Sequence, residues 1–354
     1  MMSKKVGILT LHFGLNYGGV LQTFASKETL KSLGYEPIII DRLPDCFSRN
    51  YPKVRQILHP LTQRAFYAFR RDELQPATRP IFTSEELTAL LQTDFYGIIV
   101  GSDQVWRKEA FSVNGDYYLI HQQDLPLKKV AYSASTGVAH WQYNEQETQQ
   151  IKTALQKFSG LSVREAESVP VFKEACGIEV QNILDPTLIA NPAIYQKLCQ
   201  KAKLNGKGKL VTYILDWTEK KQQLLKQACE VLNLEAQHIL PLEKKRKGLL
   251  SRMLYQDPTV YDWVNQIATA DFVLTDSFHG MAFSIIFNRP FVAIGNPERG
   301  MARFTSLLNH FNLTSRLAEN TLPDDLTTPI DYDTVNKLLN NQRNLGINFL
   351  KESL

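Results

Sequence analysis

The residues best suited to chemistry form a short segment, Asp276-Ser277-Phe278-His279-Gly280, which follows the apolar run Phe272–Leu274. The run is typical of a buried strand, and residues 281–287 are expected to form a helix. His279 would then lie near the helix N-terminus, where backbone N–H groups and the helix dipole favour a phosphate or a carboxylate. Gly280 would let a ligand approach the backbone closely. The segment predicts an anion site with an imidazole as acid or base; alternatively, Ser277 caps the helix and His279 is an ordinary buried histidine.

A second polar segment, Gly101-Ser102-Asp103-Gln104-Val105-Trp106, directly follows the apolar residues 98–100. The Asp103 carboxylate at a strand end can accept a proton or hold a sugar hydroxyl, and the nearby Trp106 ring suits the apolar face of a sugar. The alternative is an Asx turn in which Asp103 only caps the residues that follow it.

The loop of residues 12–19, which contains Asn16, Tyr17 and Gly18, is polar and rich in glycine. It could present backbone amides to an anion or a sugar. The spacing GxGxxG is absent and no Walker lysine follows, so we do not expect a nicotinamide-dependent enzyme.

Two arginines are candidate anion clamps. Arg164 follows the expected strand 161–163, and its planar guanidinium matches a carboxylate or phosphate in a two-pronged contact. The alternative is an ion pair with Glu165 or with another acid. Arg303 is a further candidate.

Short apolar runs alternate with amphipathic helical patterns along the whole chain, which predicts an α/β fold of parallel sheets covered by helices. The chain has 354 residues, more than a single hydrophobic core usually serves, so two domains are expected. We place an N-terminal domain at 1–190, with a helical insertion at about 46–80, a second domain at 191–325, and a helical tail at 326–354. The expected strands are 6–11, 38–40, 97–100, 129–132, 161–163, 182–184, 209–215, 238–240, 271–275 and 290–294.

Charge and hydropathy narrow the class of protein. The formal net charge of +4 gives no dense basic face of the kind that binds nucleic acid. The N-terminal apolar run is too short for a signal peptide, and no run approaches the roughly 18 apolar residues of a membrane span, so a cytoplasmic protein is expected. The basic stretches 46–80 and 243–252 are interpreted as solvated surfaces, with contact to an anionic lipid or glycan carrier as the alternative.

Taken in order, the motifs resemble those of the polysaccharide pyruvyl transferase family over most of the chain. The residues that carry the resemblance are Asn16-Tyr17-Gly18-Gly19-Val20-Leu21-Gln22, Gly101-Ser102-Asp103-Gln104-Val105-Trp106, Ser162-Val163-Arg164-Glu165, Leu184-Asp185-Pro186-Thr187, and Asp276 to Gly280 continuing to Arg289-Pro290-Phe291. The resemblance implies a GT-B-like architecture, with two Rossmann-like domains facing each other across a cleft. It also implies phosphoenolpyruvate as donor, with donor contacts from His279 and Arg164.

Transfer of pyruvate as a ketal needs an anion cradle, an acid and a base. We assign catalysis to His279 and Asp103. Donor binding is assigned to Arg164, Ser277, Gly280 and Arg303, and acceptor binding to Asn16, Tyr17, Gly18 and Gln104. The acceptor is a sugar, lipid-linked or oligosaccharide, and no cofactor or metal is expected. The alternatives are a GT-B glycosyltransferase that uses a nucleotide sugar, and a non-catalytic glycan-binding protein on the same scaffold.

Overall fold

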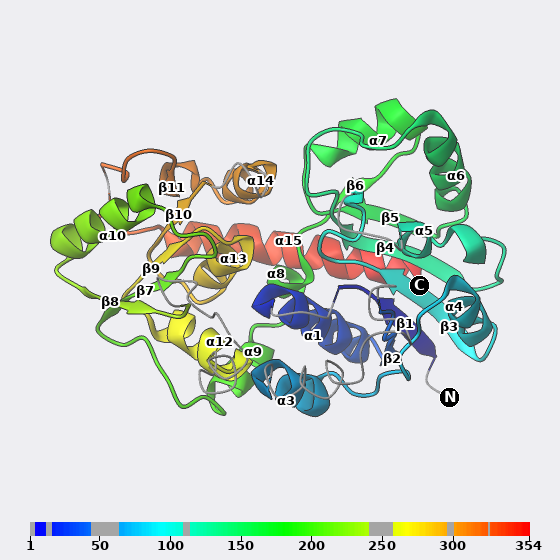
Figure 1. Ribbon diagram of the computed structural model, residues 1–354, viewed down its shortest axis with the longest axis horizontal. Coiled ribbons are helices and arrows are strands. Elements are labelled where there is room, and N and C mark those ends of the chain that lie inside the picture. Colours follow the sequence, from blue (N-terminus) through cyan, green and yellow to red (C-terminus); the bar gives the residue numbers. More distant parts are fainter. Residues whose placement is uncertain are drawn as a thin grey trace. The chain divides into compact units, whose positions relative to one another are not determined.

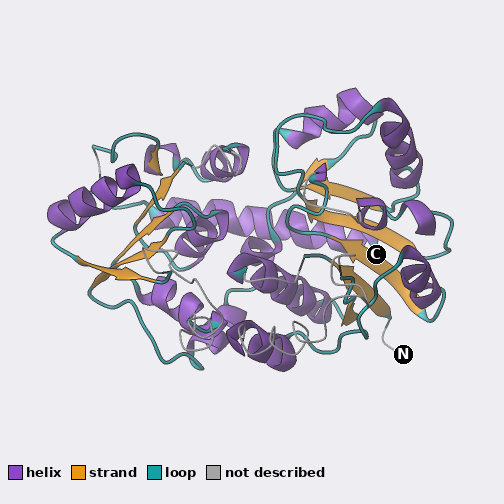
Figure 2. Cartoon of the chain, in the orientation of Figure 1, coloured by secondary structure: helices purple, strands orange, loops and turns teal. Residues whose placement is uncertain are grey.

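The computed structural model describes residues 4–11, 16–43, 64–108, 114–240, 258–295, 301–324 and 326–354. The chain forms two compact units (Figure 1). Unit 1 takes its described residues from Met1–Gln56, Arg70–Ala190 and Asn341–Leu354, and unit 2 from Ile57–Phe69 and Asn191–Asn340. Each unit is built around one parallel sheet with helices packed against it (Figure 2).

As far as it is described, unit 1 has a six-stranded sheet in the order β2-β1-β3-β4-β5-β6, with every pair parallel. Its strands are β1 (Lys5–Leu9), β2 (Glu36–Ile39), β3 (Phe95–Val100), β4 (Lys128–Ala134), β5 (Gly160–Val163) and β6 (Gln181–Asn182). Its helices are α1 (Tyr17–Ser32), α4 (Ser84–Leu91), α5 (Asn114–Tyr117), α6 (Glu145–Leu155), α7 (Ser168–Cys176) and α8 (Pro186–Ile189), with the short turn η3 (Ile120–Gln122).

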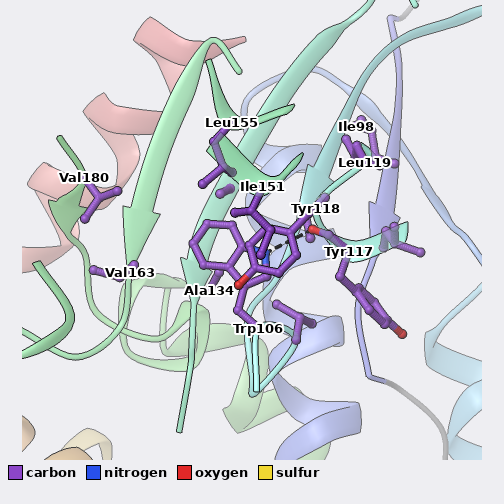
Figure 3. Packing of buried hydrophobic residues seen from close by; sticks show 14 of the residues in the cluster. Ile98, Trp106, Tyr117, Tyr118, Leu119, Ala134, Ile151, Leu155, Val163 and Val180 are labelled. Carbon is purple, nitrogen blue, oxygen red and sulfur yellow. Dashed lines mark hydrogen bonds between the residues drawn. The ribbon is translucent and has the colours of Figure 1, made fainter. Parts of the chain in front are cut away.

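The unit 1 sheet is covered on both faces, as parallel sheets require. Ile98 belongs to a core cluster with Trp106 and Phe172, whereas its neighbour Ile99 belongs to a different cluster with Phe349. Successive residues of a strand point to opposite faces, so the uninterrupted apolar run at 98–100 supplies both cores. Figure 3 shows the first cluster from close by.

In its described part, unit 2 has a five-stranded parallel sheet in the order β11-β10-β9-β7-β8. Its strands are β7 (Lys209–Tyr213), β8 (Glu235–His238), β9 (Phe272–Thr275), β10 (Phe291–Ile294) and β11 (Leu317–Ala318). Its helices are α9 (Ala193–Cys199), α10 (Glu219–Leu232), α12 (Val260–Thr269), α13 (Phe278–Ile286) and α14 (Ala302–His310), with the turn η5 (Thr314–Arg316). Two helices straddle the units: α3 (Arg64–Glu73) and α15 (Tyr332–Ser353).

Helix α12 illustrates how the sequence positions these elements. Thr259 and Asp262 form a reciprocal capping box at its start. Val260, Trp263 and Ile267 are completely buried, at the i, i+3, i+7 spacing expected for a core-facing helix. Trp263 lies edge-on to Phe283 of α13, with ring centroids 5.1 Å apart, so α12 supports the helix that carries His279.

The ten expected strands are all present, and the α/β expectation of parallel sheets is confirmed. Some details differ. The strand expected at 182–184 is β6 at 181–182, and the strand expected at 238–240 is β8 at 235–238, so each shares one residue with its prediction. β11 was not predicted, and α13 begins at Phe278 rather than 281. Within the described ranges, no helix has both the length and the apolar character needed to cross a bilayer. Residues 46–63 of the expected insertion, and the basic stretch 243–252, lie outside the described residues.

Candidate functional site

Each sheet has a switch point, where two neighbouring strands are followed by connections that run toward opposite edges of the sheet. In open α/β sheets, ligands bind at this point, beyond the carboxyl ends of the strands. In unit 1 this switch point lies between β1 and β3, and in unit 2 between β7 and β9. The Gly101–Trp106 segment directly follows β3, and Asp276–Gly280 directly follows β9. The two motifs with the most chemical potential therefore occupy the preferred ligand position of their own sheet.

In unit 2, Ser277 stands at the N-cap of α13 and His279 is the second helical residue. The Ser277 side chain makes no capping hydrogen bond, so the structure does not support the interpretation of this serine as a helix cap. His279 is 6% exposed and lies edge-on to the ring of Phe278, with centroids 5.2 Å apart. The helix end that carries these two side chains has the positive pole of the α13 dipole.

Asp276, the residue before this helix start, is held by hydrogen bonds from the β7–α10 connection. Its carboxylate accepts from the amides of Leu215, at 2.6 Å, and Asp216, at 3.2 Å. The ammonium of Lys221, in α10, donates to the same carboxylate at 2.6 Å and to the carbonyl of Asp216 at 2.8 Å. Asp276 is thereby fully engaged, and it ties the end of β9 to the end of β7.

Gly280 is required by close packing against β9. A Cβ at this position would fall closest to Thr275 Oγ1 and only 2.9 Å from Thr275 Cβ. The Thr275 hydroxyl donates to the carbonyl of Tyr213 at 2.7 Å and accepts from the amide of Ser277 at 3.1 Å. The first turn of α13 is therefore fixed directly over the strand end. Arg303 belongs to α14, which packs against α13 in the same unit, and it is partly buried.

In unit 1, Arg164 is the centre of a buried charge cluster with three carboxylates, those of Asp103, Glu165 and Asp185. Its guanidinium contacts Glu165 at 3.1 Å, Asp185 at 3.1 Å and Asp103 at 3.8 Å. Burial disfavours the charged guanidinium, but the three carboxylates outweigh burial and raise the pKa of Arg164. Arg164 is 3% exposed, and its ion pairs match the alternative interpretation of this residue.

Hydrogen bonds join this Arg164 cluster to the switch point of the sheet. Ser102 donates to Asp185 at 3.0 Å, and its amide donates to the side chain of Gln22, in α1, at 3.1 Å. Thr10, directly after β1, donates to the carbonyl of Ser102 at 3.0 Å. The ends of β1 and β3 and the start of α8 are thus linked through buried polar groups.

Asp103 has a left-handed φ of 65°, a conformation that aspartate tolerates better than most residues. Its carboxylate accepts from the amide of Gln104 at 2.9 Å, so an Asx-type contact is present alongside the approach of Arg164. The residue is 7% exposed. Gln104 is partly buried, and its amide oxygen accepts from Arg107 at 3.2 Å.

The remaining acceptor candidates lie at the start of α1. Asn16 is the exposed N-cap residue and its side chain makes no capping bond, whereas Tyr17 and Gly18 are buried. Among the predicted site residues, the structure brings Asp103 into contact with Arg164. Asn16, Tyr17 and Gly18 are neighbours in the sequence, and so are Ser277, His279 and Gly280.

Trp106 does not form the sugar platform that its position suggested. It is completely buried and stacks on Tyr118 with centroids 5.0 Å apart (Figure 3). It also packs against Phe172. Its indole N–H donates to the carbonyl of Tyr117 at 3.1 Å. The ring is part of the core because Tyr118 and Phe172 arrive from other parts of unit 1.

Two positions that sequence reasoning did not select are Lys221 and Asp185. Lys221 lies on the buried face of α10 with Leu224, Leu225 and Ala228, and a lysine within an apolar helical stripe is a signal that was available. Asp185 accepts from both the amide and the hydroxyl of Thr187. Among the described residues, no group of His, Cys, Asp and Glu is placed to hold a metal ion.

Comparisons with known proteins agree with this architecture. The structure of UDP-N-acetylglucosamine 2-epimerase from Rickettsia bellii is similar to this chain, with a TM-score of 0.52 at 10% identity over 99% of this chain and 97% of that one. UDP-GlcNAc 2-epimerase from Neisseria meningitidis bound to UDP-GlcNAc gives 0.49 at 11% identity, over 98% and 99%. UGT89C1 of Arabidopsis thaliana complexed with UDP gives 0.49 at 12% identity, over 99% and 100%. The similarity to the Rickettsia bellii structure, with its TM-score above 0.5, shows that the fold is GT-B-like.

Sequence comparison gives a more specific result. A search of curated proteins found no match. The family model for polysaccharide pyruvyl transferase matches residues 16–298, which include the Gly101–Trp106 segment, the Arg164 cluster and the whole of the β9–α13 junction. Because the match spans well over half of the chain, this protein belongs to the polysaccharide pyruvyl transferase family.

Proposed function

We propose that this protein transfers pyruvate from phosphoenolpyruvate to two hydroxyls of a sugar, forming a cyclic ketal during synthesis of a cell-surface glycan. Family membership supports the reaction class. The observation that carries the assignment of residues is the β9–α13 junction, where Ser277 and His279 stand at a helix N-terminus beyond the switch point of the unit 2 sheet.

Phosphoenolpyruvate carries a phosphate and a carboxylate, so the donor needs an anion site. We assign this site to Ser277, the amides of the first turn of α13 around Gly280 and, from α14, Arg303. A helix N-terminus and a serine hydroxyl that makes no capping hydrogen bond are suitable partners for phosphate oxygens. His279 is the acid–base residue beside the leaving phosphate.

The proposed reaction begins with protonation of the methylene carbon of phosphoenolpyruvate, which makes the adjacent carbon electrophilic. One sugar hydroxyl adds to this carbon and loses its proton to a base. The bond between that carbon and the phosphate oxygen then breaks, and phosphate leaves. A second hydroxyl of the same sugar adds to the carbon and loses its proton, which closes the ketal. The methyl group and the released phosphate account for the protons that the two hydroxyls lose.

On the acceptor side we assign Asp103 as the base or as the anchor for a hydroxyl, with Asn16, Tyr17, Gly18 and Gln104 as further contacts. Arg164, which the resemblance places among the donor contacts, is already occupied by three carboxylates. We therefore assign it the role of holding Asp103, which lies 3.8 Å away.

The test is release of inorganic phosphate from phosphoenolpyruvate, measured with a panel of sugars and oligosaccharides and with no acceptor as control. We expect release that depends on the acceptor, together with a ketal product detected by mass spectrometry. Release with no acceptor dependence, or none with any acceptor, contradicts the proposal.

Thermal protection separates the alternatives. A ligand at about one hundred times its dissociation constant stabilises the folded protein by about 2.7 kcal/mol. Protection by phosphoenolpyruvate supports the proposal, whereas protection by a UDP-sugar alone supports a glycosyltransferase. Protection by glycans alone, without phosphate release, supports a binding protein.

A further inference from the structure

The pair formed by Lys221 and Asp276 lies next to the residues assigned to the donor. Asp276 is 1% exposed and immediately precedes Ser277. Its carboxylate accepts three hydrogen bonds, from the amides of Leu215 and Asp216 and from Lys221. Since these donors occupy both carboxylate oxygens, Asp276 is an anchor rather than an acid or base for substrate.

Lys221 is unusual for a lysine because it is 8% exposed. Among the described residues, Lys129 is the other buried lysine, and its ammonium donates to the carbonyls of Leu125 and Leu127. Lys221 instead donates to a buried carboxylate at 2.6 Å, and the side chain of that carboxylate has no exposed area. A buried lysine costs desolvation energy, so a buried position beside a buried acid needs a reason.

The electrostatics of the helix start gives a reason for burying this lysine. A carboxylate one residue before a helix N-terminus opposes the positive pole of the dipole and repels an incoming anion. Lys221 cancels that charge within the low-dielectric interior, where charges interact strongly. The same ammonium also bonds the carbonyl of Asp216, which holds the β7–α10 connection against the end of β9.

We propose that Lys221 and Asp276 are positioning residues for the donor site: Asp276 fixes the start of α13, and Lys221 keeps that carboxylate from repelling the anionic donor. The inference rests on the proposed function, because it takes phosphoenolpyruvate as the anion. A pair that served stability alone would leave donor affinity unchanged when its charge balance is altered in a protein that still folds.

The experiment compares Lys221→Met, Asp276→Asn and the double variant Lys221→Met/Asp276→Asn with the wild type. Lys226→Met is the matched control, because Lys226 lies in the same helix and is exposed. The dissociation constant of phosphoenolpyruvate is measured by isothermal titration calorimetry, and KM for donor and acceptor by phosphate release.

We expect Lys221→Met to weaken phosphoenolpyruvate binding at least about tenfold, equivalent to about 1.4 kcal/mol. The KM of Lys221→Met for the acceptor should stay within about twofold of the wild type, a change of about 0.4 kcal/mol. The donor affinity of the control Lys226→Met should stay within the same range. The double variant has no uncompensated charge and should recover most of the lost donor affinity, although it contains neither side chain of the pair. A pair that served stability alone would recover stability in the double variant as well, because no unpaired buried charge remains, but it would leave donor affinity unchanged in every variant that folds. Loss and recovery of donor affinity therefore separate the two roles.

If Lys221→Met does not fold, the double variant decides: donor affinity within about threefold of the wild type supports charge compensation, and a loss of tenfold or more overturns it. A folded Lys221→Met protein with unchanged donor affinity also overturns the inference. The two proposals fail separately. Wild-type protein that binds phosphoenolpyruvate but releases no phosphate refutes the proposed reaction and leaves the comparison of affinities valid, whereas wild-type protein that does not bind it refutes both.

Discussion

Substitution of Gly280 by alanine should disturb the start of α13, because the added methyl group has no room beside Thr275. The new Cβ would lie only 2.9 Å from Thr275 Cβ and closer still to Thr275 Oγ1, whereas real Cβ atoms essentially never come within 3.0 Å of another heavy atom. Two responses are open to the protein. In one, the side chain of Thr275 rotates, which removes the Oγ1 contact and leaves only a small shift to relieve the Cβ contact; in the other, the first turn of α13 moves.

The first response removes the partner of the Tyr213 carbonyl and of the Ser277 amide. Each buried group left without a partner costs about 1–3 kcal/mol. Alanine is better than glycine inside a helix by about 1 kcal/mol, which offsets part of the loss. The net fall in the free energy of unfolding is then about 3 kcal/mol. In the second response, a displacement of roughly 1 Å at His279 lowers the reaction rate by about 100-fold.

The assay is urea unfolding of Gly280→Ala, Thr275→Ala and the double variant, followed by circular dichroism. In the Thr275→Ala background the hydroxyl is already absent, so Gly280→Ala should cost at least about 1 kcal/mol less than in the wild type. Strict additivity, together with a change of less than about 0.5 kcal/mol for Gly280→Ala alone, would refute this account of the packing.

Three further predictions concern single side chains. His279→Ala should lower turnover in the phosphate-release assay by about 10²–10⁴-fold, while the exposed control His121→Ala leaves turnover unchanged; equal effects would remove His279 from its role. Arg164→Met leaves three buried carboxylates without their cation and should lower the free energy of unfolding in urea by about 3–5 kcal/mol, against almost nothing for the exposed Arg71→Met; similar stabilities for the two variants would contradict the cluster. Burial lowers the pKa of His238, so the unfolded chain takes up this proton first as the pH falls. The free energy of unfolding should therefore fall below about pH 6.5, and His238→Asn should reduce the slope; an identical slope in both proteins would exclude His238 as a source.

Much of the framework around the site could be predicted from local sequence. The run Phe272–Leu274 is apolar and bounded by polar residues, and the strand and helix on either side of Asp276–Gly280 follow from that pattern. Helix α12 was predictable because its buried residues recur at helical spacing. These features depend on neighbours in the chain, which a sequence displays directly.

The contacts of the charged residues could not be predicted in the same way. Of the three carboxylates around Arg164, only that of Glu165 is adjacent in sequence, whereas Asp185 is 21 positions away. The partner of Lys221 is 55 positions away. Trp106 was misplaced for the same reason, since the rings that bury it come from α7 and from the residue after α5. Such contacts depend on tertiary packing, which cannot be predicted from the pattern of neighbouring residues.

The division of α15 between the units affects how the protein is made. Phe349 and Leu350 belong to the same core cluster as Val6, Ile8 and Val130 of the N-terminal strands. Tyr96 donates a hydrogen bond to the carbonyl of Leu354, on the same side of unit 1. While a ribosome is still translating residues 191–340, strands β1, β3 and β4 therefore lack part of their apolar cover. Completion of the unit 1 core is therefore a late event in synthesis, because it waits for the residues of α15 from Asn341 onward.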